Sequence, residues 1–167
     1  MSENKIIKYD LDGYDTVTQA LDVLLNAFPG LSADDEITFA ALEETGGKAF
    51  FPVSGAAVES EKTSVTGRVV QTCLYPFYVY YRLRGLSESQ KANAKEWLEN
   101  IGRWLERQPV DINGERCKLL EYPPLADGRI LTAIERQTPA YLDAITDDQT
   151  ETWAIYLVAR YKYEYQK

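Results

Sequence analysis

The stretch "VVQTCLYPFYVYYRLRG", residues 69–85, decides the fold of this chain. Five aromatic residues crowd into positions 75–81, and the odd positions from Val69 to Leu83 are mostly apolar. Side chains that alternate with a period of two are typical of a β-strand with one buried face. We therefore predict a long strand over residues 68–84, with a bulge or a sheet edge at Pro76, which has no N–H to donate.

A second run, "TWAIYLVARYKYEYQK", residues 152–167, alternates in the same way. One of its faces is predicted to lie on the core, whereas the other turns polar toward its end. A strand of roughly 16 residues would span about 50 Å, but a compact domain of this length has a radius of gyration of only about 15 Å. The two strands must therefore either bend sharply at bulges or project from the domain as hairpins.

Two segments predict amphipathic helices, each with its own start signal. Residues 14–30 repeat apolar side chains at helical spacing, with Asp15 as the expected N-cap. Residues 87–109 begin with a capping box of Ser87 and Gln90. The apolar face of this second helix is predicted to contain Trp97, Leu98, Ile101, Trp104 and Leu105. The side that mostly faces water is predicted to contain Lys91, Lys95, Glu99, Arg103 and Glu106.

Shorter strands are predicted around these elements. They lie in "DEITFAAL" (35–42), "EETGGKAFFPVSG" (43–55), "VDINGERCKLLEY" (110–122, with a tight Asn-Gly turn) and "RILTAIERQ" (129–137). The polar segment 55–67 is either a loop or the continuation of a hairpin, and residues 138–150 are expected to form a polar connection. Two helices and about six strands predict a single α+β domain over residues 1–167, a mainly antiparallel sheet with both helices packed on one face.

The charge of the chain narrows its possible partners. The formal net charge is −8, and the first 65 residues hold the whole imbalance, with twelve acidic residues against four basic ones. Such a surface repels phosphates, so we expect no specific nucleic-acid partner. This acidic surface either keeps the protein soluble, lines the lumen of a ring, or is complementary to a basic protein partner. No apolar run approaches membrane-spanning length and no apolar signal segment opens the chain, so neither a membrane nor secretion is expected.

Signals for catalysis are nearly absent. The chain has no histidine, the commonest general base and transition-metal ligand. Cys73 lies inside a predicted strand and is interpreted as a buried structural thiol, whereas Cys117 has no evident activating partner. The acidic clusters at 34–36 and 147–151 lack the ligand spacing of a calcium loop and are interpreted as solvated acids. We therefore predict a non-enzymatic protein with no metal and no other cofactor.

The aromatic runs leave two interpretations open. In the first, they form core and interface, and a projecting strand end with Tyr161, Tyr163 and Tyr165 on one side suits a repeated contact between copies. In the second, the protein is a small-ligand-binding protein or an enzyme whose aromatic pocket is built around Tyr75–Tyr81. A deep, closed pocket with converging polar groups would favour the second interpretation.

Nearly the whole chain resembles small structural proteins of Gram-positive prophages, which are encoded among the head–tail joining genes and labelled minor capsid, phage or tail proteins. The segments that carry the resemblance are "IIKYDLDGYDTVTQALDVLLNAFPGL", "FPVSGAAVESEKTSVTGRVVQTCLYPFYVYYR", "EWLENIGRWLERQP" and "TPAYLDAITDDQTETWAIYLVARYKYEY". The predicted order of helices and strands is also similar to that of the tail terminators of long-tailed phages.

The resemblance implies a subunit of an oligomeric ring, commonly a hexamer, that caps the tail tube and presents a surface to the head connector. It implies no enzymatic activity, and a location in the host cytoplasm during assembly and then at the head–tail junction of the virion. Loops such as residues 55–67 meet the tube or the neighbouring subunit in tail terminators. By this resemblance, Glu59 and Glu61 are expected at a ring surface.

Overall fold

The computed structural model of the protein describes residues 6–85 and 87–167. Within these residues the chain forms two helices, a seven-stranded sheet and a separate two-stranded ribbon. The helices are α1 (Gly13–Asn26) and α2 (Glu88–Leu105). The sheet contains β1 (Ile37–Phe39), β2 (Gly47–Pro52), β3 (Ala57–Thr63), β4 (Arg68–Arg84), β7 (Arg129–Arg136), β8 (Tyr141–Ile145) and β9 (Thr150–Gln166). The ribbon is formed by β5 (Val110–Ile112) and β6 (Glu115–Cys117), joined at the predicted Asn-Gly turn.

Strands β4 and β9 form the spine of the sheet. They pair antiparallel along their whole length, from Arg68 opposite Gln166 to Arg84 opposite Thr150, without a register shift. β2 and β3 flank β4, β7 and β8 flank β9, and only β1 runs parallel to its neighbour, β2. The fold is therefore α+β with a mostly antiparallel sheet, as predicted, and the long strand over residues 68–84 is confirmed.

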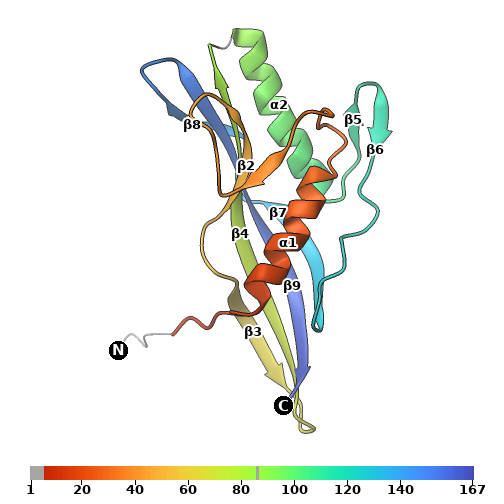
Figure 1. Cartoon of the computed structure of the whole chain (residues 1–167). Helices are drawn as coiled ribbons and strands as arrows, with labels where there is room; N and C mark the ends of the chain where they lie inside the picture. The colour runs from red at the N-terminus through yellow and green to blue at the C-terminus, as the bar shows by residue number, and fades with distance from the viewer. Residues whose placement is uncertain (1–5, 86) are drawn as a thin grey trace.

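The length of the spine is accommodated by projection rather than by sharp bulges. Figure 1 shows the lower ends of β3, β4 and β9 extending past α1, and the β8–β9 hairpin extending at the other end of the sheet. The continuous β4–β9 register contains no bulge that would shorten either strand. Of the two predicted solutions, the sheet therefore uses hairpins that project from the helix-covered core.

Pro76 lies at a local edge within β4, not at a bulge. β3 pairs with β4 up to Leu74 and β2 pairs with it from Phe77, so Pro76 falls between the two neighbours. Its carbonyl accepts a hydrogen bond from the Val53 N–H at 3.0 Å, on the side of β2 and β3. Because the N and O of one residue point to the same side of an antiparallel strand, the missing N–H weakens no bond to β9.

The core lies between the two helices and one face of the sheet. The inward residues from β4 and β9 meet the apolar faces of both helices in a single cluster, which includes Leu21, Leu25, Tyr75, Phe77, Val79, Leu98, Ile101, Trp104, Leu105, Ile155 and Leu157. Phe28 joins the helices, with its ring centroid 5.4 Å from that of Trp104 and 5.7 Å from that of Trp97. The predicted face of α2 is thus confirmed, with Trp97 only partly buried.

The two helix starts differ in how well the sequence predicted them. The Ser87–Gln90 capping box of α2 is present in both directions. The prediction for α1 was wrong, because the helix begins at Gly13 and Asp15 lies inside its first turn. The Gly13 N–H is instead bound by the carboxylate of Asp10, at 3.1 Å.

Two polar segments of the chain contain strands. Residues 57–63 form β3, so the hairpin alternative holds for the segment 55–67 and the loop alternative is wrong. Within residues 138–150, β8 pairs with the start of β9, with a register shift between Leu142 and Ala144. Both strands lie at the edge of the sheet and are largely exposed, which is why their sequences carry so little apolar alternation.

Candidate assembly interface

The sheet face opposite the helices carries a cluster of aromatic side chains. Tyr78 of β4 stacks on Tyr156 of β9, with ring centroids 4.8 Å apart. The Tyr80 ring lies 5.6 Å from that of Tyr78 and 5.4 Å from that of Phe51 on β2. All four side chains remain partly exposed, and we call this set the tyrosine face. An antiparallel sheet normally presents polar side chains on a face that stays in water, so this face has the character of a contact surface.

An open hollow of about 780 Å³ adjoins the tyrosine face. Phe51, Tyr78 and Tyr80 form its aromatic wall, and Arg82 and Asp143 are its charged lining residues. The guanidinium of Arg82 is held in place, because its Nε donates to Thr152 Oγ1 at 2.9 Å and its Nη1 donates to the carbonyl of Glu43 at 3.0 Å. The hollow is therefore preformed and combines an apolar wall with a fixed positive charge.

Two tyrosine hydroxyls of this face, those of Tyr80 and Tyr156, have a raised pKa and stay neutral at physiological pH. Burial raises the pKa of Tyr80 to about 12, and the nearby carboxylate of Asp143 acts in the same direction. Burial also raises the pKa of Tyr156, with a further contribution from Tyr78. These side chains can thus offer apolar rings and uncharged hydrogen-bonding groups, a combination enriched at protein interfaces.

The aromatic run of β4 does not line one closed pocket. Because side chains alternate along the strand, Tyr75 and Phe77 enter the core while Tyr78 and Tyr80 point to the other face. The Tyr75 hydroxyl is bound to the Thr18 hydroxyl at 2.7 Å, beneath α1. The closed tyrosine pocket required by the ligand-binding interpretation is therefore not formed by this run.

The three tyrosines predicted to lie on an exposed strand end have different environments. Tyr161 is fully buried and its hydroxyl donates to Asp10 at 2.7 Å, so the prediction that it is free to contact a partner was wrong. Tyr163 and Tyr165 are partly exposed near the projecting end, with ring centroids 5.0 Å apart. The guanidinium of Arg129 lies 3.8 Å from the centroid of the Tyr163 ring. Only Tyr163 and Tyr165 remain as candidate contact residues of this group.

Glu59 and Glu61 are both exposed on β3, the outer strand of the projecting hairpin. Glu59 forms an ion pair with Arg160 of β9. Glu61 accepts hydrogen bonds from Gln71 at 2.8 Å and from Lys8 at 3.0 Å, which together lower its pKa. Both carboxylates therefore already have partners within their own chain, and a contact with another subunit would have to share or replace these partners.

A buried ion pair ties the N-terminal segment, which lies beside β3, to β7 at the other edge of the sheet. Asp10 accepts two hydrogen bonds from Arg129, at 2.7 and 2.8 Å, and both side chains are almost completely buried. Burial alone would raise the pKa of Asp10, but the bonds from Arg129 and Tyr161 outweigh it and lower that pKa. A Cβ at Gly13 would lie 2.0 Å from an Asp10 oxygen, so this close approach requires glycine. No pattern in the sequence indicates the pair, whose members are 119 positions apart.

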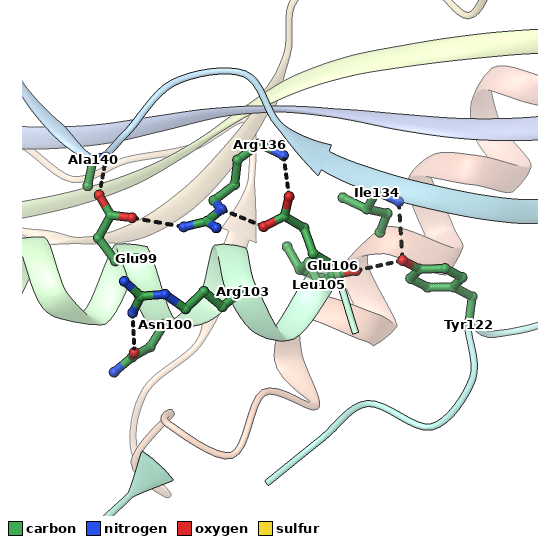
Figure 2. A network of polar contacts seen from close by, with 9 residues as sticks. All are labelled: Glu99, Asn100, Arg103, Leu105, Glu106, Tyr122, Ile134, Arg136 and Ala140. Carbon is green, nitrogen blue, oxygen red and sulfur yellow. Dashed lines mark hydrogen bonds and ion pairs between the residues drawn. The ribbon is translucent and has the colours of Figure 1, made fainter. Parts of the chain in front are cut away.

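A second polar network fixes α2 to β7 and to the start of β8 (Figure 2). Arg136 pairs with Glu99 at 3.1 Å and with Glu106 at 2.5 Å. Glu99 also accepts from the Ala140 N–H at 2.7 Å, just before β8 begins. The prediction that Glu99 and Glu106 face water was therefore wrong. In the same network the Tyr122 hydroxyl donates to the carbonyl of Leu105 at 2.7 Å.

The two cysteines lie in different environments, and neither belongs to a metal-binding group among the described residues. Cys73 is buried, and burial raises its pKa to about 11, so the thiol stays protonated. Cys117 is partly exposed on the β5–β6 ribbon. In the part of the chain that the structure describes, no three cysteine, aspartate or glutamate side chains are grouped so as to hold a metal ion.

Comparison with models of known protein families and with curated proteins finds no match to this chain. Over the described residues, no helix is both long enough and apolar enough to span a bilayer.

Proposed function

We propose that this protein is a non-enzymatic structural subunit that assembles with copies of itself into a ring. The observation that carries the proposal is the tyrosine face, a partly exposed aromatic surface on the side of the sheet opposite both helices. Large apolar surfaces that stay accessible on a folded domain mark sites of protein contact. The projecting ends of β3, β4 and β9 add a second surface beyond the core (Figure 1).

The class of assembly follows from the resemblance to prophage structural proteins. The order of helix, hairpin strands, long strand, helix and further strands agrees with the one on which the similarity to tail terminators rests. We therefore propose a subunit of the head–tail junction, in a ring whose expected copy number, by the resemblance to tail terminators, is six. Its further partners would be the tail tube and the head connector, in the host cytoplasm during assembly and then in the virion.

The test is the copy number and position of the protein in assembled phage particles. Quantitative mass spectrometry of purified virions should find several copies per particle, and labelling in electron micrographs should place them at the head–tail junction. Cross-linking on assembled tails should connect copies of the chain to one another. A single copy per particle, or absence from the particle, would reject the proposal.

A second candidate is favoured by one observation, the hollow beside the tyrosine face. An aromatic wall with Arg82 and Asp143 in its lining is the kind of surface that holds a planar or polar small molecule. A thermal-shift screen against nucleotides, sugars and acyl-CoA compounds tests this function. A reproducible, saturable shift that is lost in Tyr80→Ala would favour a ligand-binding protein over a purely structural one.

A further inference from the structure

The segment that leads into α1 carries two exposed isoleucines. Ile6 is 94% exposed and Ile7 is 61% exposed. Figure 1 shows this segment extending away from the body of the molecule before it reaches α1. We call residues 6–9 the N-terminal arm. Adjacent large apolar side chains on an extended segment are typical of strands that bind to another protein surface.

The base of the arm is already fixed in an extended form. Tyr9 pairs antiparallel with Ala57, and the Val58 N–H donates to the carbonyl of Lys8 at 2.8 Å. The arm therefore leaves the body from the edge of β3 in a set direction. Because its base is ordered before any contact is made, docking would require the ordering of few further residues.

The hollow beside the tyrosine face has the properties that such an arm needs. Its volume of about 780 Å³ exceeds that of the hollow of about 510 Å³ beside α1. Phe51, Tyr78, Tyr80, Leu42 and Val53 give it an apolar lining, and Val53 itself is 52% exposed. Two isoleucines placed here would cover apolar surface on both partners.

The charges around the hollow complement those of the arm. In the sequence, "KIIK" at residues 5–8 sets the two isoleucines between two lysines. The hollow shares Ala41 and Leu42 with a second hollow, and the lining of the two together contains five carboxylates against two cations. Of these cations, Lys48 is bound to Asp35 at 2.8 Å and Arg82 to neutral oxygens. The aromatic hollow itself has one cation, Arg82, and one carboxylate, Asp143, and the excess of carboxylates lies in the second hollow beside it. It is this acidic side that complements the lysines of the arm, of which Lys8 forms an exposed ion pair with Glu61 in its own chain.

We propose that the N-terminal arm of one copy docks in the aromatic hollow of a neighbouring copy, with Ile6 and Ile7 on the wall of Phe51, Tyr78 and Tyr80. The inference rests on the proposed function, since it requires that the chain contacts copies of itself. The near-complete exposure of Ile6 means that the arm does not fill the hollow of its own chain. Arm and hollow are different surfaces, so the contact is head-to-tail and repeats from copy to copy until a ring closes.

Cross-linking between differently tagged chains tests the proposed contact directly. Both chains carry Cys117→Ser, one adds Ile7→Cys and the other adds Ala144→Cys, an exposed residue that lines the hollow on β8. A short thiol cross-linker should join the two tags in the mixture. The matched control replaces Ala144→Cys with Val23→Cys, on the exposed side of α1, and should give no joined product. If the control pair links as well as the test pair, or neither links at any protein concentration, the inference is overturned.

Removal of the isoleucines supplies an independent measurement. The double variant Ile6→Ser and Ile7→Ser should keep the melting temperature of the wild type, because neither side chain is part of the core. Its dissociation constant for self-association should rise at least about tenfold, given the apolar area lost from the contact. Val23→Ser is the matched control and should associate as the wild type does.

The outcomes separate the inference from the function on which it rests. If the wild type self-associates, but the serine variant associates equally well and no arm-to-hollow cross-link forms, the docking inference fails while the proposed ring stands. If the protein is absent from phage particles or present in one copy, the proposed function fails, whatever the arm does.

Discussion

Asp10 and Arg129 are the residues on which the N-terminal part of the fold depends. Asp10 binds the first N–H of α1, the hydroxyl of Tyr161 and the guanidinium of Arg129, so one carboxylate joins a helix, β9 and β7. Its role could not be predicted from the sequence, because periodicity and capping signals depend on residues that are close together along the chain, whereas Arg129 is 119 positions away. Neither residue is part of a recognisable motif in its own segment. The pair forms only when the folded chain brings β7 next to the residues that precede α1.

Loss of one partner of this pair should be strongly destabilising. Arg129→Met leaves the carboxylate of Asp10 buried without its cation, which is expected to lower the free energy of unfolding by about 3–5 kcal/mol. Urea unfolding followed by circular dichroism measures the change. Arg116→Met, which removes an exposed pair with Asp111, is the control and should change stability by less than about 1 kcal/mol. Equal effects of the two substitutions would contradict this account of the buried pair.

The same carboxylate predicts how stability depends on pH. The pKa of Asp10 is lowered in the folded chain relative to its ordinary value of 3.8, so the folded state binds this proton less readily than the unfolded state does. Its contribution to stability is therefore complete above 3.8 and is lost as the pH falls through the folded pKa. The stability difference between wild type and Asp10→Asn should be constant at neutral pH and shrink below about pH 4. A difference that grows on acidification would contradict this sign.

At the scale of elements, apolar periodicity and capping residues predicted the helices and strands that pack on the core. The same signals did not predict the edge strands β3 and β8. The limits of β4 follow from strict alternation, and those of α2 from its capping box and apolar face, because burial on one side imposes each pattern. β3 and β8 have no such constraint, since edge strands with both sides near water accept glutamate, lysine and aspartate. The tyrosine face could not be predicted either. Alternation along β4 and β9 separates the side chains into two faces, but it does not show which face the helices cover.

The buried face of α2 should tolerate truncation poorly. Trp104→Ala or Leu105→Ala removes a side chain packed between the helices and the sheet, with an expected loss of about 2–5 kcal/mol in the free energy of unfolding. Chemical denaturation measures each loss. Lys95→Ala, on the exposed side of the same helix, is the matched control and should have little effect. A small loss at Leu105 would mean that α2 is not firmly packed on the sheet.

Hydrogen exchange should rank the strands by their place in the sheet. Amides of residues 97–105 and 153–161 should exchange slowly, because they lie in the core helix and in the central strand. Amides of residues 57–63 should be intermediate, since β3 pairs with β4 on one side, and residues 64–67 at the turn should exchange fastest. Mass spectrometry of the monomer gives these rates by segment. Uniformly fast exchange across 55–67 would restore the loop interpretation that the structure replaces.

At the scale of the whole molecule, the tyrosine face should decide assembly more than folding. Tyr78→Lys places a charge at the centre of this face, where a partner would have to bury it, while in the isolated chain the lysine can extend its amine into water. The lost stacking on Tyr156 should cost only about 0.5–1.5 kcal/mol of stability. Sedimentation velocity should therefore find a folded protein that no longer self-associates. Val23→Lys adds the same charge on the exposed side of α1 and should assemble normally. If Tyr78→Lys assembles as the wild type does, the ring contact lies elsewhere, and the projecting end with Tyr163 and Tyr165 becomes the surface to test.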